Sequence, residues 1–407
     1  MFKNHLKIAW RNLIRDRQFT LLNVIGLSAG LACTLLILLW VQGEYKIDHF
    51  GATDSQIYQL MEHRKDAGNQ GLSDESVGPL SQTLKLQQPQ ILYAAAVAPA
   101  DWWPLFILSA SDKNIKAVGQ YAGKDYFNIF PFPLLEGKAG QVLADKNSIV
   151  LSAQLARKLF GTTQNCIGKK VRFQHQTDFF VSGIFTLPDN STQQFDFVLS
   201  FDYLKDVQPW VYTWGNTGPH NFVLLKKGTN VDQLNREIAG VITQNSGDTT
   251  RAAYAMLFSG NYLDNTFVHG AKVGSKIDNV RLFSLIAVFI LAIACINFMN
   301  LSTAKATRRL KEVGIKKVMG AGRRQLIFQF LIESLLLTAF SVVLAVALAW
   351  LLLPEFNELT GKQTTLDLTP GLILALLGLT LFTGLLAGVT RPFISRGSIP
   401  SAYSKAG

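Results

Sequence analysis

"TRRLKEVGIKKVMGAGRRQL" runs from Thr307 to Leu326, and its surroundings decide the fold class. The stretch holds seven bases and one acid, whereas residues 282–304 carry no charge and residues 325–354 carry one acid and no base. A helix needs about 20 predominantly apolar residues to cross a bilayer, and both flanking runs are that long. We therefore predict a short basic loop between two transmembrane helices.

Two further runs, residues 18–43 and 368–390, carry no charge either. Both are again long enough to cross a bilayer. We predict four transmembrane helices at 19–42, 281–304, 326–353 and 371–390, with a periplasmic loop at 354–370. The fold class is then an α-helical membrane protein with a large domain, residues 43–280, inserted between helices one and two.

The net charge of +11 is localised in short segments. Residues 1–17 hold five bases and one acid, residues 305–324 hold eight bases and one acid, and the tail after residue 390 adds three bases. Residues 44–281 hold 22 bases and 22 acids. Because basic loops stay on the cytoplasmic side, we predict an inner-membrane protein with cytoplasmic termini and a periplasmic domain. The excess of basic over acidic residues reflects this topology, and we therefore predict no nucleic-acid partner.

Residues 1–18 form a predicted amphipathic helix on the cytoplasmic side. Lys3, Lys7, Arg11 and Arg15 follow i, i+4 spacing, which is typical of a helix lying on anionic membrane lipid. A solvated helix remains the alternative. In the first apolar run, Gly26 and Gly30 are four residues apart, and small residues at this spacing allow close helix packing. An ordinary pair of membrane glycines is the other interpretation.

The domain at 43–280 contains both helix-type and strand-type spacing of apolar residues. Helical patterns occupy 77–90, 152–161 and 230–243, and short apolar or alternating runs at 147–151, 169–174, 178–185 and 220–228 are typical of strands. This interleaving predicts an α+β domain, with two lobes as one arrangement. Cys166 is the only cysteine in the domain, so no disulfide is expected within it.

Motifs for catalysis are missing from the sequence. "GTTQNCIGKK" (161–170) lacks the spacing and the hydroxyl residue of a phosphate-binding loop. The histidines are scattered without metal-ligand spacing. We predict no catalytic residue, no cofactor and no metal site, and therefore a protein that is not itself an enzyme.

The basic segment at 305–325 has an amphipathic pattern of its own. Leu310, Val313 and Ile315 fall on one side at helical spacing, and Arg309 and Lys317 project elsewhere. Two interpretations remain open from the residues alone. The segment either anchors the topology, or it forms a docking helix for a cytoplasmic partner.

Several stretches resemble FtsX/MacB-type ABC transporter permeases. The resemblance rests on "LKIAWRNLIRDRQFTLLNVIGLSAGLA" (6–32) and "INFMNLSTAKATRRLKEVGIKKVMGAGRRQLIFQFLIESLLLT" (296–338). "GKDYFNIFPFPLLEGKAG" (123–140), "NSIVLSAQLARKLFG" (147–161) and "IGKKVRF" (167–173) resemble the periplasmic core domain of the same family. The match extends from residue 1 to about 388 in family order.

The resemblance implies a permease subunit that transmits ATP-driven movement from a separate cytoplasmic ABC ATPase to the periplasm. In MacB-type proteins the ATPase is fused at the N-terminus, and such a domain is not part of this sequence. Expected partners are the ATPase, membrane lipid, a second permease half or an identical copy, and a periplasmic adaptor. The residues carried over for ATPase docking are Arg309, Lys311, Glu312, Val313, Gly314, Ile315, Lys317, Gly320 and Ala321.

Glu333 is the single acid of the third apolar run. Glu333 and Asn297 each lie about 12–14 Å from the cytoplasmic ends of their predicted helices. An acid at that depth is costly unless it is paired. We predict that Glu333 hydrogen-bonds Asn297 or Asn300; a proton relay is the alternative.

The tail reads "VTRPFISRGSIPSAYSKAG" (389–407) and departs from the family pattern of a Tyr-Pro-Ala turn, Asn-Pro and a closing Leu-Lys-Gly. A shifted reading frame can restore those elements, so we expect residues 389–407 to be out of frame and the chain to be half of a longer permease. A natural half-size permease acting as a homodimer is the alternative. Competing functions are a membrane receptor with a periplasmic sensing domain and an envelope or division scaffold.

Overall fold

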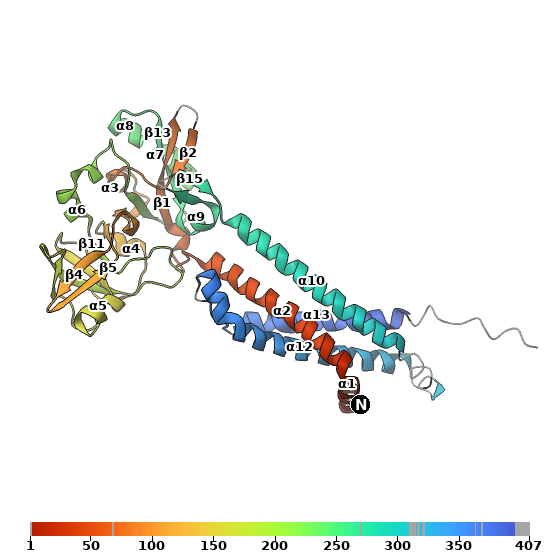
Figure 1. The fold of residues 1–407 in the computed structure, drawn as a ribbon. Coiled ribbons are helices and arrows are strands. Elements are labelled where there is room, and N and C mark those ends of the chain that lie inside the picture. Colours follow the sequence, from red (N-terminus) through yellow and green to blue (C-terminus); the bar gives the residue numbers. More distant parts are fainter. Residues whose placement is uncertain are drawn as a thin grey trace, which may run out of the picture. The chain divides into compact units, whose positions relative to one another are not determined.

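A computed structural model describes residues 2–66, 69–268, 271–308, 315, 318–319, 322–362, 364–367 and 369–394 (Figure 1). The chain divides into two compact units, one of residues 1–44 with 279–407 and one of residues 45–278. Of the predicted tail at 391–407 and the segment expected to be out of frame at 389–407, residues 395–407 lie outside the described residues.

The first unit consists of long helices. Their bounds are α1 (Phe2–Arg15), α2 (Arg17–Lys46), α10 (Ile277–Arg308), α12 (Arg323–Thr360) and α13 (Pro370–Ile394). Among the described residues, α2, α10 and α12 are long and apolar enough to cross a membrane. The fourth predicted span corresponds to α13, whose apolar part at 370–385 falls below the same length.

The predicted loop at 354–370 is partly wrong. Helix α12 continues through Pro354 to Thr360 and ends at Gly361, whose φ of 65° is left-handed and whose N–H donates to the carbonyl of Asn357. Proline removes one backbone donor, but membrane helices tolerate it where neighbouring groups satisfy the freed backbone. The helix-forming residues that follow Pro354 then extend α12 by more than a turn.

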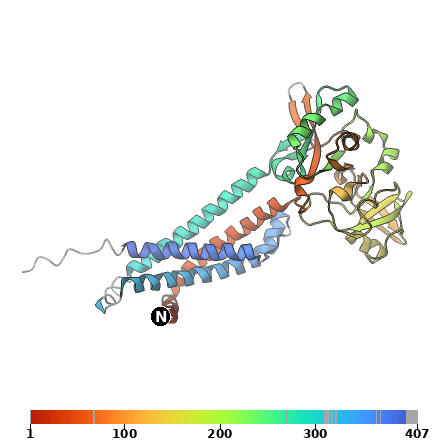
Figure 2. The same ribbon diagram turned by 180° about the vertical axis from the view of Figure 1, so that it is seen from behind.

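The helical unit has a common apolar core. Leu27, Leu31 and Leu35 of α2 contribute to it together with residues of α10 and α12, such as Phe298 and Leu337. Helices α12 and α13 lie side by side in both views (Figures 1 and 2), and a Cβ on Gly384 of α13 would come within 2.6 Å of Leu335 of α12. Glycine at this position therefore permits the close approach.

The second unit is built on one large mixed sheet. Thirteen described strands belong to it, in the order β13-β1-β12-β3-β6-β11-β8-β10-β9-β4-β5, with β2 on β1 and β7 on β10. The strands are β1 (Ile57–Asp66), β2 (Asn69–Ser73), β3 (Ile91–Ala98), β4 (Phe106–Ala110), β5 (Lys113–Ala117), β6 (Gly119–Ala122), β7 (Leu134–Glu136), β8 (Ser148–Ser152), β9 (Lys170–Phe173), β10 (Thr177–Phe185), β11 (Phe197–Ser200), β12 (His220–Leu225) and β13 (Arg251–Leu257). A separate hairpin joins β14 (Thr266–Val268) to β15 (Ala271–Gly274).

Short helices connect these strands. They are α3 (Leu80–Gln87), α4 (Tyr126–Ile129), α5 (Ala153–Phe160), α6 (Phe201–Val207), α7 (Val231–Ile238), α8 (Val241–Ser246) and α9 (Phe258–Asp264), with one-turn helices at η1 (Asp54–Gln56), η2 (Ala100–Trp102) and η3 (Pro209–Tyr212). Helices and strands thus share one domain, as the two types of spacing predict.

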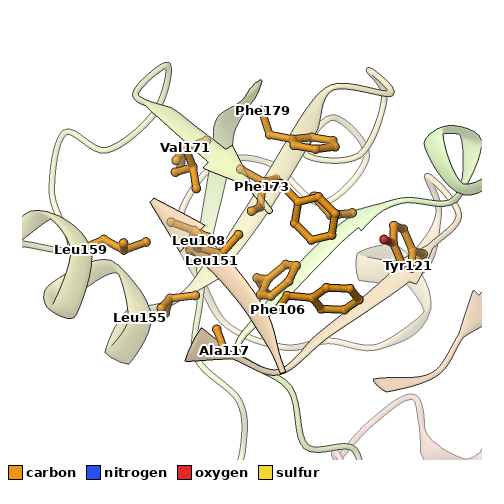
Figure 3. Close-up of a cluster of buried hydrophobic side chains, with 14 of the residues drawn as sticks. Phe106, Leu108, Ala117, Tyr121, Leu151, Leu155, Leu159, Val171, Phe173 and Phe179 are labelled. Carbon is orange, nitrogen blue, oxygen red and sulfur yellow. The ribbon is translucent and has the colours of Figure 1, made fainter. Parts of the chain in front are cut away.

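Separate cores lie at the two ends of the sheet. At the β4–β5 end, Phe106, Leu108 and Phe173 pack against Leu155 and Leu159 of α5 (Figure 3). At the β13–β1 end, a second cluster joins the sheet to α3, α7 and α8 through Leu60, Leu84, Leu234 and Ile242. Residues 45–278 nevertheless form one compact unit with a further core cluster between these two, so the two-lobed arrangement stays a prediction.

The helix predicted at 152–161 is confirmed in detail as α5. The Ser152 hydroxyl accepts from the Leu155 N–H at the start, and Gly161 ends the helix with a φ of 74°. The helix predicted at 230–243 is instead two helices, α7 and α8, which meet at Ala239 and Gly240. Glycine weakens a helix interior, which accounts for the break.

Candidate functional site

Most of the predicted docking segment lies outside the described residues. This applies to Arg309, Lys311, Glu312, Val313, Gly314, Lys317, Gly320 and Ala321. Ile315 is described and is 62% exposed. The structure does describe the helix ends on either side, and these carry a buried cluster of charges.

Lys305, one turn before the end of α10, is the centre of this cluster. Its Nζ lies 2.7 Å from Oε1 of Glu333 on α12 and 3.3 Å from Oδ2 of Asp16, the residue between α1 and α2. It also lies 4.8 Å from the ring centroid of Phe19. Glu333 is fully buried and Lys305 is 6% exposed. Three chain segments far apart in the sequence therefore meet at one ammonium group, which we call the Lys305 cluster.

A second ion pair lies at the other end of α2. Nζ of Lys362, just beyond α12, lies 2.7 Å from Oε1 of Glu44, whose side chain is 5% exposed. Asp16 precedes Glu44 by 28 residues, and Glu333 precedes Lys362 by 29. At a helical rise of about 1.5 Å per residue, both spacings correspond to about 42–44 Å. The Lys305 cluster, through Asp16 just before α2, and the Glu44–Lys362 pair thus link α2 to α12 at two levels.

The structure pairs Glu333 with Lys305, whereas Asn297 and Asn300 are both exposed. A contact of Glu333 with either asparagine stays a prediction. Lys305 belongs to the basic segment at 305–325, and its long side chain reaches Glu333. The signal in the sequence is the pair of isolated acids, Asp16 just before the first apolar run and Glu333 inside the third.

Gly26 and Gly30 face α10. A Cβ on Gly30 would come within 2.5 Å of Cβ of Ala294, and one on Gly26 would lie 3.2 Å from Nδ2 of Asn297. One turn further, Oγ1 of Thr34 lies 3.5 Å from the carbonyl oxygen of Ala287. The backbones of α2 and α10 therefore approach closely along this face.

Gly30→Ala should force α2 and α10 apart, because the facing Ala294 side chain cannot rotate away. Overpacking of this kind costs about 1–3 kcal/mol, so we expect a lower thermal unfolding temperature of the full chain in detergent. Gly43→Ala is the matched control on the same helix, since a Cβ there would meet no described atom within 4 Å. Equal unfolding temperatures for the two variants would contradict the close packing.

Comparison with known proteins now adds to this geometry. The model of the MacB-like periplasmic core domain matches residues 20–241, and that of the FtsX-like permease C-terminal domain matches residues 284–391. The chain belongs to the FtsX/MacB-type ABC transporter permeases. Together with the apolar helices, the match identifies an inner-membrane protein with a periplasmic domain.

Curated relatives are distant but cover most of the chain. The macrolide export ATP-binding/permease protein MacB of Burkholderia lata is 23% identical over 400 residues, which is 95% of this chain and 55% of that protein. The uncharacterized ABC transporter permease YvrN of Bacillus subtilis is 21% identical over 367 residues, covering 84% of this chain and 85% of that protein. The chain spans a little over half the length of the MacB relatives.

The solved structures that resemble the chain cover about half of it. A domain of a putative permease from Porphyromonas gingivalis has a TM-score of 0.44 at 19% identity, covering 53% of this chain and 95% of that one. The periplasmic region of MacB from Actinobacillus actinomycetemcomitans has a TM-score of 0.36 at 14% identity, covering 52% and 92%. The assignment to the family therefore rests on the two family models.

Proposed function

We propose that the chain is the transmembrane subunit of an ABC system, in which a separate cytoplasmic ATPase docks on residues 305–325. The Lys305 cluster supports this, because it fixes α10, α12 and the α1–α2 junction to one another directly beside the docking segment. A push on that segment would reach α2, α10 and α12 together. These helices would then carry the movement to the periplasmic domain, for export or extraction of a substrate.

The spacing of the two ion pairs supports a specific placement in the membrane. A bilayer with its headgroups is about 40–45 Å thick, close to the estimated separation of about 42–44 Å along α2 and α12. We place the Lys305 cluster at the cytoplasmic headgroup level and the Glu44–Lys362 pair at the periplasmic level. Glu333 then lies at the membrane surface, and the first turns of α12 extend into the cytoplasm.

This placement includes four membrane crossings, with α13 as the fourth and both termini in the cytoplasm. Helix α1 buries Ala9 and Leu13 and leaves Trp10 about half exposed, so its open face suits the lipid headgroup region. A second permease unit, either another copy of this chain or a second half, would complete the membrane part. A periplasmic adaptor remains a further partner in this proposal.

Charge reversal in the docking segment tests the proposal. Arg309→Glu with Lys317→Glu should abolish association of the ABC ATPase while membrane insertion stays normal. The measurement is the amount of ATPase that purifies with the tagged chain from native membranes, identified by mass spectrometry. The ATPase gene product should then bind the purified wild-type chain in detergent and fail to bind the variant.

Lys226→Glu with Lys227→Glu makes the same change of charge on two exposed lysines of the periplasmic domain. This control variant should retain the ATPase at the wild-type level. Retention of the ATPase by the Arg309/Lys317 variant would show that docking occurs elsewhere on the chain.

A further inference from the structure

The periplasmic domain contains a cavity of about 440 Å³ with both apolar and polar walls. Its wall includes residues of β1, β3, β6 and β12, of the loop at 192–194, and of α9. Phe222, Phe258 and Tyr262 supply aromatic surface, and several amide side chains line the remainder. The cavity is large enough for a small organic molecule.

Three polar groups in this wall have unused hydrogen-bonding capacity. Among the described residues, eight buried side-chain atoms lack a hydrogen-bond partner, and the Nε2 atoms of Gln120 and Gln193 and Oδ1 of Asp74 are three of them. Gln120 is only 3% exposed. An unsatisfied buried polar group costs about 1–3 kcal/mol. Two hydrogen-bond donors and one acceptor around this cavity therefore lack partners.

The wall also has an excess of acids. Asp48, Asp74 and Asp101 line the cavity with a single lysine, Lys276. Burial raises the pKa of the Asp74 carboxyl, and the neighbouring Asp101 raises it further. Burial lowers the pKa of the His220 imidazole below its ordinary 6.5, against the opposing effect of Asp74, so that imidazole is mainly uncharged at neutral pH.

Existing contacts already occupy the other charged groups. Asp48 accepts from the Thr192 N–H at 2.8 Å and from the Thr192 hydroxyl at 2.6 Å. Nζ of Lys276 lies 3.9 Å from the ring centroid of Tyr262. The remaining negative charge is thus at Asp74, whose Oδ2 lies 3.7 Å from Nε2 of the uncharged His220 imidazole, and at the exposed Asp101.

A metal ion does not fit this distribution of charge. Over the described part of the chain, no three carboxylate, imidazole or thiol side chains converge as metal ligands. An organic ammonium group suits the site better, because aromatic faces attract such cations and a buried carboxylate gains from a charged partner. Oxygen atoms on the same molecule would accept from the amides of Gln120 and Gln193.

We propose that this cavity binds a small hydroxylated amine, such as an amino sugar or amino alcohol, with its ammonium group at Asp74 and Asp101. This binding site goes beyond the proposed transport function and does not depend on the ATPase. It also adjoins both connections of the domain to the helical unit. Asp48 follows the end of α2 by two residues, and Lys276 directly precedes α10.

Hydrogen bonds hold both connections in place. Nδ2 of Asn190 donates to the carbonyl oxygens of Lys46 and His49, each at 2.8 Å. The backbone N–H of Lys276 donates to the carbonyl of Leu263 at 2.9 Å. A bound amine would therefore order the two chain segments that enter and leave the domain.

The test is calorimetric titration of the full-length chain in detergent micelles. The probes are glucosamine and ethanolamine, with glucose, N-acetylglucosamine and ethylene glycol as uncharged counterparts. At least one amine should bind, and the uncharged counterparts should bind at least tenfold more weakly. Binding of neither amine, or equal binding of an amine and its uncharged counterpart, would overturn the proposal.

Variants assign the binding to the cavity. Asp74→Asn preserves the size of the side chain and should weaken amine binding at least tenfold, and Gln193→Leu should weaken it several-fold. Asp112→Asn, in an exposed turn between β4 and β5, is the matched control and should bind as the wild type does. Unchanged affinity in Asp74→Asn would place the amine elsewhere and refute the assignment, whatever Gln193→Leu does.

Discussion

Lys305→Met should destabilise the full chain by about 3–5 kcal/mol, because removing one partner of a buried ion pair leaves the other charge uncompensated. Most of this loss arises at Glu333, because its fully buried carboxylate loses Nζ of Lys305, which lies 2.7 Å from Oε1. Thermal unfolding in detergent should occur at a clearly lower temperature than for the wild type. Lys46→Met, which removes an exposed lysine at the end of α2, is the control and should have little effect.

The double variant Lys305→Met with Glu333→Leu separates stability from transmission. Replacing a whole buried ion pair by apolar groups is often neutral for stability, so we expect most of the loss to be recovered. ATPase activity of the assembled complex should nevertheless become independent of changes at the periplasmic domain, since the charged link between α10 and α12 is gone. If the double variant is stable and its ATPase activity still responds to changes at the periplasmic domain, the Lys305 cluster has a structural role only.

Glu333→Gln and Glu333→Leu distinguish charge from hydrogen bonding at the same position. Glutamine can still accept from Lys305, whose ammonium also has Asp16 at 3.3 Å. We therefore expect a smaller loss of thermal stability for glutamine than for leucine. Equal losses would show that the negative charge itself is required.

The sequence predicts those helices whose ends are set by residues at the ends themselves. The helix at α5 is an example, since Ser152 supplies the N-terminal cap and Gly161 the left-handed residue at the end. The long apolar helices follow in the same way from their composition. Such local rules failed where tertiary packing opposed them. The predicted loop begins at Pro354, but this proline lies inside α12.

Long-range pairing could not be predicted from these signals. Strand β1 pairs with β13, so that Tyr58 lies opposite Leu257 from the far end of the domain, and nothing near either residue specifies the other. The Lys305 cluster has the same character. Asp16 and Lys305 lie beside apolar runs and Glu333 lies inside one, and only the packing of the helices brings the three together.

The same long-range strand pair carries a further buried ion pair, between Arg251 and Glu62. Nε and Nη2 of Arg251 on β13 each donate to a carboxylate oxygen of Glu62 on β1, both at 2.7 Å. Glu62 is fully buried, and the Arg251 side chain is 9% exposed. Nη1 of Arg251 also lies 3.4 Å from the carbonyl oxygen of Gly215. This arginine therefore fixes one edge of the sheet to the loop beside it.

Arg251→Met should lower the free energy of unfolding of the periplasmic domain by about 3–5 kcal/mol. The Glu62 carboxylate stays buried but loses most of the positive charge that pairs with it. For a domain of this size, 1 kcal/mol corresponds to about 2–4 °C, so the unfolding temperature should fall by roughly 10 °C. Limited proteolysis of the full chain should show earlier cleavage within residues 45–278. The helical unit should keep its resistance.

Arg64→Met is the matched control, because Arg64 bonds the same carboxylate. Its Nε lies 2.8 Å from Oε1 of Glu62, but its side chain is 40% exposed. Exposed ion pairs contribute about 0–1 kcal/mol, so this variant should unfold within a few degrees of the wild type. Similar losses for Arg64→Met and Arg251→Met would contradict the argument, since burial is the main difference between two arginines that bind the same oxygen of Glu62.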